Sequence, residues 1–382
     1  MQAPYKLYGS EVSYFTGKVR AYLRWKGLAF EEVPSDAAAF RDVIVPRVGF
    51  PVIPLLLTPE DDCLQDSTDI IEALEARHPA PSITPEGPRQ RLISLLLELY
   101  GDEWLVIPAM HYRWHHNREW AIAEFGALSA PGASPEAQRE IGAKRAVPFA
   151  KAAELLGGEP AMHAAIEQSY ESLLAELSAH FAVHPCLLGG RPGMGDFGLI
   201  GPLYAHQYRD PFTGRHMRDK APSVARWVER MQHPVAHSGD FLPNDALPDT
   251  LRPILARMFR ELLPVLADSA VRVREWMAEH PGEPLPRAIG SHAFTLEGRQ
   301  GTRIIRPYSL WMLQRARDCY RSLAPDEQVA AAEWLRPLGG EAGPPRWPMA
   351  AAARGRRPRE AQARLLLRRG PPAVRRRVRG AD

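Results

Sequence analysis

The sequence is poor in cysteine. Its 382 residues contain only three, Cys63, Cys186 and Cys319, which are widely spaced and form no CxxC pair. An odd, scattered set of this kind predicts neither a disulfide framework nor a cysteine-based zinc site. We therefore expect a reducing environment, which places the protein in the cytoplasm.

Long apolar runs are also missing. The longest candidate, residues 92–99, is interrupted by Ser94 and Glu98 and falls far short of the roughly 18 residues that span a bilayer. The first residues lack the basic start and apolar segment of a secretory signal. We expect no membrane-spanning segment and no export signal.

A positive balance of charge is absent from most of the chain: residues 1–343 sum to −7, and the excess of basic residues lies at the end. The formal net charge is +3, yet residues 344–382 contain twelve arginines against Glu360 and Asp382. Residues 341–382 are rich in Arg, Pro, Gly and Ala, with little that could be buried, so we expect a disordered tail. Because a nucleic-acid binder usually carries its basic patch on a folded domain, we do not expect a nucleic-acid partner.

The remaining composition is that of a globular protein, with 45% hydrophobic and 24% charged residues. The length predicts two or three compact units. Within residues 1–82 the hydrophobic period alternates between strand and helix, in the order βαβαββα. The predicted strands cover residues 5–8, 29–34, 52–58 and 63–65, and the main predicted helices begin after Ser13 and at Ser67.

A proline-rich linker with a boundary near residue 85 precedes a long helical region. Residues 88–240 read as an all-α domain, with helices beginning at Leu92, over 162–181 and over 195–207. Residues 241–340 form a further, mostly helical extension that we expect to pack on the helical domain. Within it, residues 293–296 and 302–305 predict a hairpin around Gly298 and Gly301.

Three segments of the first domain carry candidate binding chemistry. Ser13 precedes a helix, where a hydroxyl can either cap the helix or hold an anion. Pro54, after Val52 and Ile53, could be cis and expose the Ile53 backbone to an extended peptide, or it could be an ordinary trans proline. Asp66 and Ser67 open a helix, where Ser67 can cap it and also hold a carboxylate while Asp66 pairs with an ammonium.

A fourth segment, Gly193 to Asp196, resembles a capping box with glycine at the cap position. We expect this segment to stabilise a helix start and to take no part in chemistry.

Taken together, the residues around Ser13, the segment 52–56, the segment 64–71 and the cap at 193–196 resemble the glutathione S-transferase superfamily. The resemblance extends over residues 5–240. It implies an α+β thioredoxin-like N-terminal domain followed by an all-α domain. It further implies glutathione as cosubstrate and a homodimer.

The resemblance also implies roles for individual residues. Ser13 matches the residue that activates the glutathione thiol, with Tyr14 and Tyr8 as alternative hydroxyls. Ile53 matches the backbone clamp on the cysteinyl residue, Pro54 the cis-proline, and Asp66 and Ser67 the γ-glutamyl site. A serine at position 13, in place of cysteine, favours thiolate stabilisation over a mixed disulfide.

A hydrophobic cosubstrate is expected between the domains, on the first helices after the linker. Met110, Tyr112 and Trp114 are the candidate electrophile pocket, with Trp104 and Trp120 nearby; the alternative is that they form core between helices. His111 and His115 could bind a metal with Glu103 or Glu119. A solvated helix face is the preferred interpretation of these histidines, so we expect no metal.

The expected function is that of a detoxifying transferase that activates the glutathione thiolate for attack on a small hydrophobic electrophile. Related isomerase, dehalogenase or peroxidase chemistry would use the same thiolate. The alternative is a non-catalytic member of this fold that acts as a binding or scaffold protein.

Overall fold

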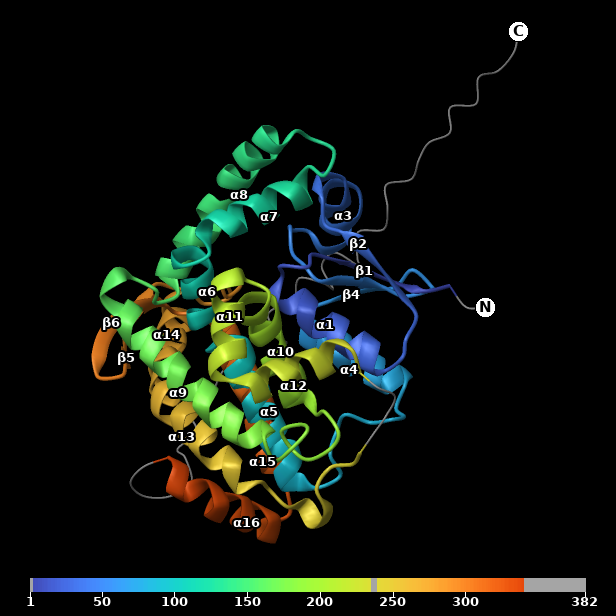
Figure 1. Cartoon of the computed structure of the whole chain (residues 1–382). Helices are drawn as coiled ribbons and strands as arrows, with labels where there is room; N and C mark the ends of the chain where they lie inside the picture. The colour runs from blue at the N-terminus through green and yellow to red at the C-terminus, as the bar shows by residue number, and fades with distance from the viewer. Residues whose placement is uncertain (1–2, 235–238, 340–382) are drawn as a thin grey trace.

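The computed structural model describes residues 3–234 and 239–339, and Figure 1 shows the N-terminal sheet (blue) on one side of a mass of helices (green to red). The sheet contains β1 (Tyr5–Gly9), β2 (Phe30–Pro34), β3 (Leu55–Leu57) and β4 (Cys63–Gln65) in the order β2-β1-β3-β4. Strand β1 is parallel to β2 and antiparallel to β3, which is in turn antiparallel to β4. This is the thioredoxin-like arrangement, so the predicted order βαβαββα is confirmed.

Helices cover both faces of this sheet, which explains why the central strand β3 is apolar along its whole length and β1 is buried except at Lys6. Leu7 and Leu56 face the main core with α1 (Tyr14–Trp25) and α4 (Ser67–Arg77). Leu55 and Leu57 point to the other face, where Ile44 packs on them. The second face is covered by α2 (Ala37–Ala39), the π-helical turn η1 (Phe40–Ile44) and α3 (Val45–Val48).

The helical domain begins at Pro88, close to the predicted boundary. Its helices are α5 (Pro88–Glu103), α6 (Val106–His115), α7 (Arg118–Ser129), α8 (Pro135–Leu155), α9 (His163–Phe181), α10 (Met194–Pro202), α11 (Pro211–Lys220) and α12 (Pro222–Gln232), with the short turns η2 (Pro160–Met162) and η3 (Leu203–Tyr208). Helices α5 and α10 cross in backbone contact: a Cβ on Gly101 would lie 2.5 Å from the Gly198 backbone. Glycine at position 101 therefore permits this close packing.

The start of α10 confirms the predicted capping box. The Asp196 carboxylate accepts hydrogen bonds from the backbone N–H groups of Gly193 at 2.9 Å and Leu187 at 3.0 Å. Burial raises the pKa of Asp196 to about 7. These contacts hold the loop before α10 against the helix, and the residues lie outside the pocket described below.

The extension is folded and mostly helical, as predicted. It contains η4 (Pro243–Asp245), η5 (Asp249–Leu251), α13 (Arg252–Glu261), α14 (Leu263–Glu279), β5 (Ser291–Leu296), β6 (Arg299–Ile304), α15 (Tyr308–Ser322), α16 (Pro325–Leu335) and η6 (Arg336–Leu338). Strands β5 and β6 form the predicted antiparallel hairpin, with Glu297 and Gly298 at positive φ in its two-residue turn. Helix α16 has no counterpart in the sequence-based expectation.

The extension packs on the helical domain, as expected, and also reaches the N-terminal domain. Helix α15 lies along α5, and its Arg315 contacts the Glu72 carboxylate of α4 at 2.6 Å. The predicted disordered tail, residues 341–382, lies outside the described residues. Within residues 3–234 and 239–339, no helix combines the length and apolarity needed to cross a membrane.

A buried ammonium group joins the domains. Nζ of Lys18, in α1, lies 2.7 Å from Glu98 and 2.6 Å from Asp102, both in α5, and 3.1 Å from the Thr68 hydroxyl of α4. The Lys18 side chain is fully buried. Burial alone would lower the pKa of Lys18, but the two carboxylates raise it, so the residue stays charged.

We predict that Lys18→Met destabilises the protein by about 3–5 kcal/mol, because it leaves the buried Asp102 carboxylate without its cation and Glu98 with Arg315 alone. Lys144→Met is the matched control, since Lys144 forms an exposed pair with Glu140 at 2.7 Å and its loss costs under about 0.5 kcal/mol. Urea unfolding followed by circular dichroism measures both values. Equal small effects in the two variants would contradict a structural role for the buried ammonium.

Candidate functional site

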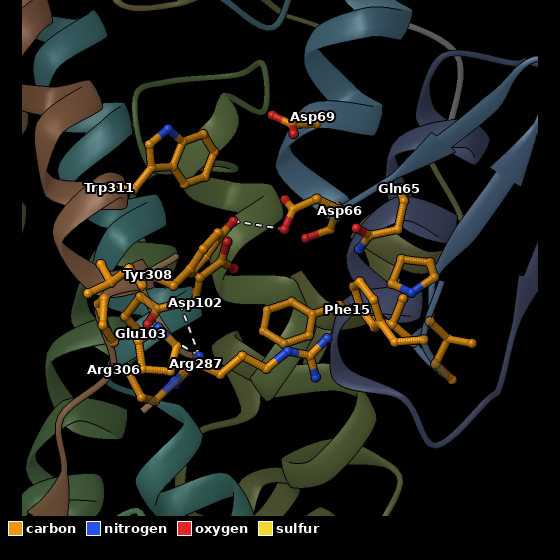
Figure 2. Close-up of a pocket in the computed structure, with 18 of the residues that line it drawn as sticks. Phe15, Gln65, Asp66, Asp69, Asp102, Glu103, Arg287, Arg306, Tyr308 and Trp311 are labelled. Atoms are coloured by element: carbon orange, nitrogen blue, oxygen red, sulfur yellow. Dashed lines mark hydrogen bonds and ion pairs between the residues drawn. The ribbon is translucent and has the colours of Figure 1, made fainter. Parts of the chain in front are cut away.

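A cavity of about 300 Å³ lies where the N-terminal domain, α5 and the extension meet (Figure 2). Its walls come from three groups of residues. The N-terminal domain supplies Phe15, Phe50, Val52, Ile53, Pro54, Gln65, Asp66, Ser67 and Asp69; α5 supplies Asp102 and Glu103; the extension supplies residues 284–287 together with Arg306, Pro307, Tyr308 and Trp311. The extension therefore forms one wall of this pocket.

Four predicted binding residues line the same pocket: Ile53, Pro54, Asp66 and Ser67. The Ile53–Pro54 peptide bond is cis, as the resemblance implied. Asp66 caps α4 by accepting a hydrogen bond from the Thr68 N–H at 3.0 Å. These two segments, at the start of β3 and at the end of β4, therefore meet at one cavity.

Asp66 has an unusual backbone conformation, with φ at +87°. Such values are costly for a residue other than glycine and persist only where surrounding contacts enforce them. One such contact comes from the extension: the Tyr308 hydroxyl donates a hydrogen bond to Asp66 Oδ2 at 2.9 Å, as Figure 2 shows. A residue of α15 thus helps to hold a predicted ligand-binding carboxylate in position.

The predicted thiol-activating hydroxyls do not line the pocket. Ser13 Oγ accepts a hydrogen bond from the Thr16 N–H at 3.3 Å, so Ser13 caps α1. The Tyr14 hydroxyl donates to the carbonyl of Gly101, and burial raises the pKa of Tyr14 well above its usual value. Tyr8 packs in the core on the far face of the sheet. Phe15 is the residue of this segment that reaches the cavity.

The predicted electrophile-binding residues are also outside the pocket. Met110 and Trp114 are buried in a cluster with residues of α7 and α8, and Tyr112 belongs to the main core. The indole N–H of Trp104 donates to Glu261 at 2.8 Å. These residues therefore lie in the core between helices, which was the alternative interpretation. The aromatic surface of the pocket comes instead from Phe15, Phe50, Tyr308 and Trp311. A role for Met110, Tyr112 and Trp114 in cosubstrate binding stays a prediction.

The α5 wall of the pocket carries two buried carboxylates that the sequence analysis did not assign to it. Asp102 Oδ2 contacts Lys18, and Asp102 Oδ1 has no hydrogen-bond partner in the described structure. Burial, together with the Glu98 charge and against the opposing effect of Lys18, raises the pKa of Asp102 to about 7. Among the described residues that line the pocket, Asp102 is the one with a buried side-chain oxygen that has no hydrogen-bond partner.

Glu103, the second carboxylate, is bound by residues of the extension. It accepts a hydrogen bond from the Ser309 hydroxyl and lies 3.4 Å from the Arg306 guanidinium, both in the extension. A second pocket arginine, Arg287, lies over the Phe50 ring, with its guanidinium carbon 4.2 Å from the ring centre. Arginines therefore line the extension side of a cavity whose other walls carry carboxylates.

Sequence reasoning missed the extension residues because they follow no recognisable motif. Arg287 and Arg306 flank the β5–β6 hairpin in irregular segments, and nothing local indicates that they face a pocket. Asp102 and Glu103 offered a signal: two adjacent acids end a helix whose neighbouring residues are apolar. A buried carboxylate usually has a partner or a function.

Comparison with known proteins gives a match at the N-terminal domain. Residues 7–82 match the family model described as "Glutathione S-transferase, N-terminal domain". No curated protein matches the sequence significantly.

Several solved structures match the chain at low sequence identity. A glutathione S-transferase from Rhodospirillum rubrum F11 is 17% identical, covers 64% of this chain and 96% of its own, and has a TM-score of 0.38. The beta-etherase LigF from Sphingobium sp. strain SYK-6 is 20% identical, covers 60% of this chain and 95% of its own, and has a TM-score of 0.45. A Methylobacterium radiotolerans glutathione S-transferase, solved in complex with glutathione sulfonate, is 20% identical, covers 63% and 99%, and has a TM-score of 0.37. Similarities this distant assign no activity to the chain.

The family match covers the segment that contains the sheet, the cis-proline and the start of α4. The similarity to the glutathione S-transferase family therefore lies in residues 7–82, the N-terminal domain.

Proposed function

We propose that the protein binds glutathione in this pocket and transfers it, as the thiolate, to a small hydrophobic electrophile. The observation that carries the proposal is that Ile53, Pro54, Asp66 and Ser67 line one cavity. The volume, about 300 Å³, lies at the lower end of the range for small-molecule sites. A mix of apolar walls and a few polar groups is typical of such sites.

The binding mode follows from the chemistry of the wall. The N-terminus of α4, at Ser67, presents backbone N–H groups and a favourable potential to a carboxylate. Asp66 offers a carboxylate to an ammonium group. The backbone at Ile53, beside β3, suits an extended peptide that adds as a short strand. These three contacts would orient the γ-glutamyl end and the cysteinyl residue of the tripeptide.

We propose Asp102 as the acceptor of the thiol proton. Two cations, Lys18 and Arg315, contact three carboxylates here, Glu72, Glu98 and Asp102. One carboxylate is therefore in excess. The excess charge is most easily neutralised by a proton on Asp102, which contacts only Lys18 and keeps Oδ1 without a partner.

In the proposed reaction the glutathione S–H bond breaks, its proton moves to Asp102 and the sulfur keeps the electron pair. The thiolate then forms a bond to the electrophilic carbon of the cosubstrate. The leaving group departs with the electrons of its own bond, and the proton on Asp102 passes to it or to water. The apolar surface of Phe15, Phe50 and Trp311 supports a hydrophobic cosubstrate beside the sulfur.

A non-catalytic binding protein is the alternative. Retention on immobilised glutathione, followed by a conjugation assay with a panel of aromatic and aliphatic electrophiles, separates the two functions. Retention without turnover across the panel would favour the binding protein, and absence of retention would contradict both. A homodimer stays a prediction, to be checked by sedimentation.

We predict that Ser67→Ala weakens glutathione binding about tenfold or more, because it removes a hydrogen bond to a charged group. Ser172→Ala is the control, since Ser172 is exposed on α9 and bonds only to its own helix. Isothermal titration calorimetry with reduced glutathione gives both dissociation constants. Equal affinities in the two variants would remove the start of α4 from the binding site.

We predict that Asp102→Asn lowers kcat/KM at least tenfold and leaves glutathione affinity within about threefold, because it removes a proton acceptor. For the native protein, kcat/KM should rise with pH through about 7, since the carboxylate must be deprotonated to accept a proton. The variant should lose this rise.

Ser13→Ala separates this proposal from the one based on the family resemblance. If the Ser13 hydroxyl stabilises the thiolate, its loss should raise the pKa of bound glutathione by about one unit or more, as read from thiolate absorbance. A raised thiol pKa in Ser13→Ala, with Asp102→Asn unchanged in rate, would assign thiol activation to Ser13 and contradict the role of Asp102.

A further inference from the structure

A second group of polar side chains gathers away from the pocket, where the end of α6 meets the start of α9. It consists of His111, His115, His116, His163 and Glu167. The imidazole ring centres lie 4.5 Å apart for His111 and His163, 4.3 Å for His115 and His163, and 4.7 Å for His115 and His116. None of these residues lines the pocket of the proposed reaction.

Three of these side chains converge on one point. Nε2 of His111 and Nε2 of His116 lie 2.9 Å and 2.7 Å from the same oxygen, Oε1 of Glu167. The three atoms all lie within 4.8 Å of one another. In a tetrahedral zinc site, ligand atoms are separated by roughly 3.3 Å, given metal bonds of about 2.0–2.2 Å. Small side-chain rotations would therefore bring all three to bonding distance.

The ring of His111 has a second nitrogen that can hold its proton. Its Nδ1 is buried and has no hydrogen-bond partner in the described structure. The ring proton can therefore move to Nδ1 when Nε2 binds a metal.

The carboxylate of this group is Glu167, whereas the sequence analysis named Glu103 or Glu119 as the possible ligand. Glu103 lies in the pocket, and Glu119 pairs with Arg139 at 2.7 Å on the surface. Glu167 comes from α9, one turn after His163. The grouping is therefore produced by the packing of α6 against α9.

We propose that His111, His116 and Glu167 form a zinc site that links α6 to α9. Two imidazoles and one carboxylate suit a borderline cation such as Zn²⁺, whereas Mg²⁺ and Ca²⁺ prefer oxygen ligands throughout. The fourth position is taken by water or by the neighbouring imidazole of His115 or His163. The site is independent of glutathione binding.

The experiment uses the untagged full chain, stripped with a chelator, and titrates it with Zn²⁺ in competition with a chromophoric chelator. We expect one Zn²⁺ per chain with micromolar or tighter affinity. His116→Gln and Glu167→Gln should each weaken binding at least tenfold, because each removes one of three ligands. Both residues are partly exposed, at 25% and 36% of their side chains, so their replacement leaves the core intact.

Glu171→Gln is the matched control, since Glu171 lies on the same helix one turn beyond Glu167 and pairs with His216. It should leave the affinity and the stoichiometry unchanged. A Co²⁺-loaded sample gives a second readout, because its visible spectrum should lose intensity in His116→Gln and Glu167→Gln alone. Absence of stoichiometric binding, or equal binding in all variants, would overturn the proposal.

Discussion

The arrangement of the domains depends on the pairing of the Lys18 ammonium inside the protein. Its two carboxylate partners belong to α5, and one of them, Glu98, also accepts from Arg315 of the extension. Because an isolated buried charge is very costly, these groups stabilise the structure only when all are present and paired. The N-terminal domain, the helical domain and the extension are therefore coupled through one set of charges. Asp102, the carboxylate in excess of the cations, faces the pocket.

The extension is part of the pocket as well as of the core. Tyr308 bonds to Asp66, Arg306 and Ser309 hold Glu103, and Arg287 lies over Phe50. The pocket residues that belong to the N-terminal domain, which matches the family model, therefore face a wall formed by the extension. Since the two sides of the pocket come from different parts of the chain, the shape of the pocket depends on how the extension packs against the N-terminal domain.

The sequence predicted local structure well and long-range contacts poorly. The change of hydrophobic period predicted the sheet and its helices, and Gly298 predicted the hairpin turn, because both signals depend on neighbouring residues. Ser13 and Ser67 were each expected either to cap a helix or to bind an anion. Ser13 caps α1, whereas α4 is capped by Asp66 and not by Ser67. Asp66 and Ser67 line the cavity, and Ser13 does not. That difference depends on how the extension packs, which no local pattern encodes.

The same limit applies to charge. Counting residues gives a chain of nearly balanced charge, but function depends on which charges are buried together. Lys18 has the appearance of an ordinary helix residue in the sequence, yet its side chain is fully buried between two carboxylates. Burial raises the pKa of Asp102, one of these two carboxylates, to about 7. A group of this kind is suited to proton transfer, because it gains and loses its proton at small cost. In the proposed reaction, the buried charges that join the domains would also supply the proton acceptor of the pocket.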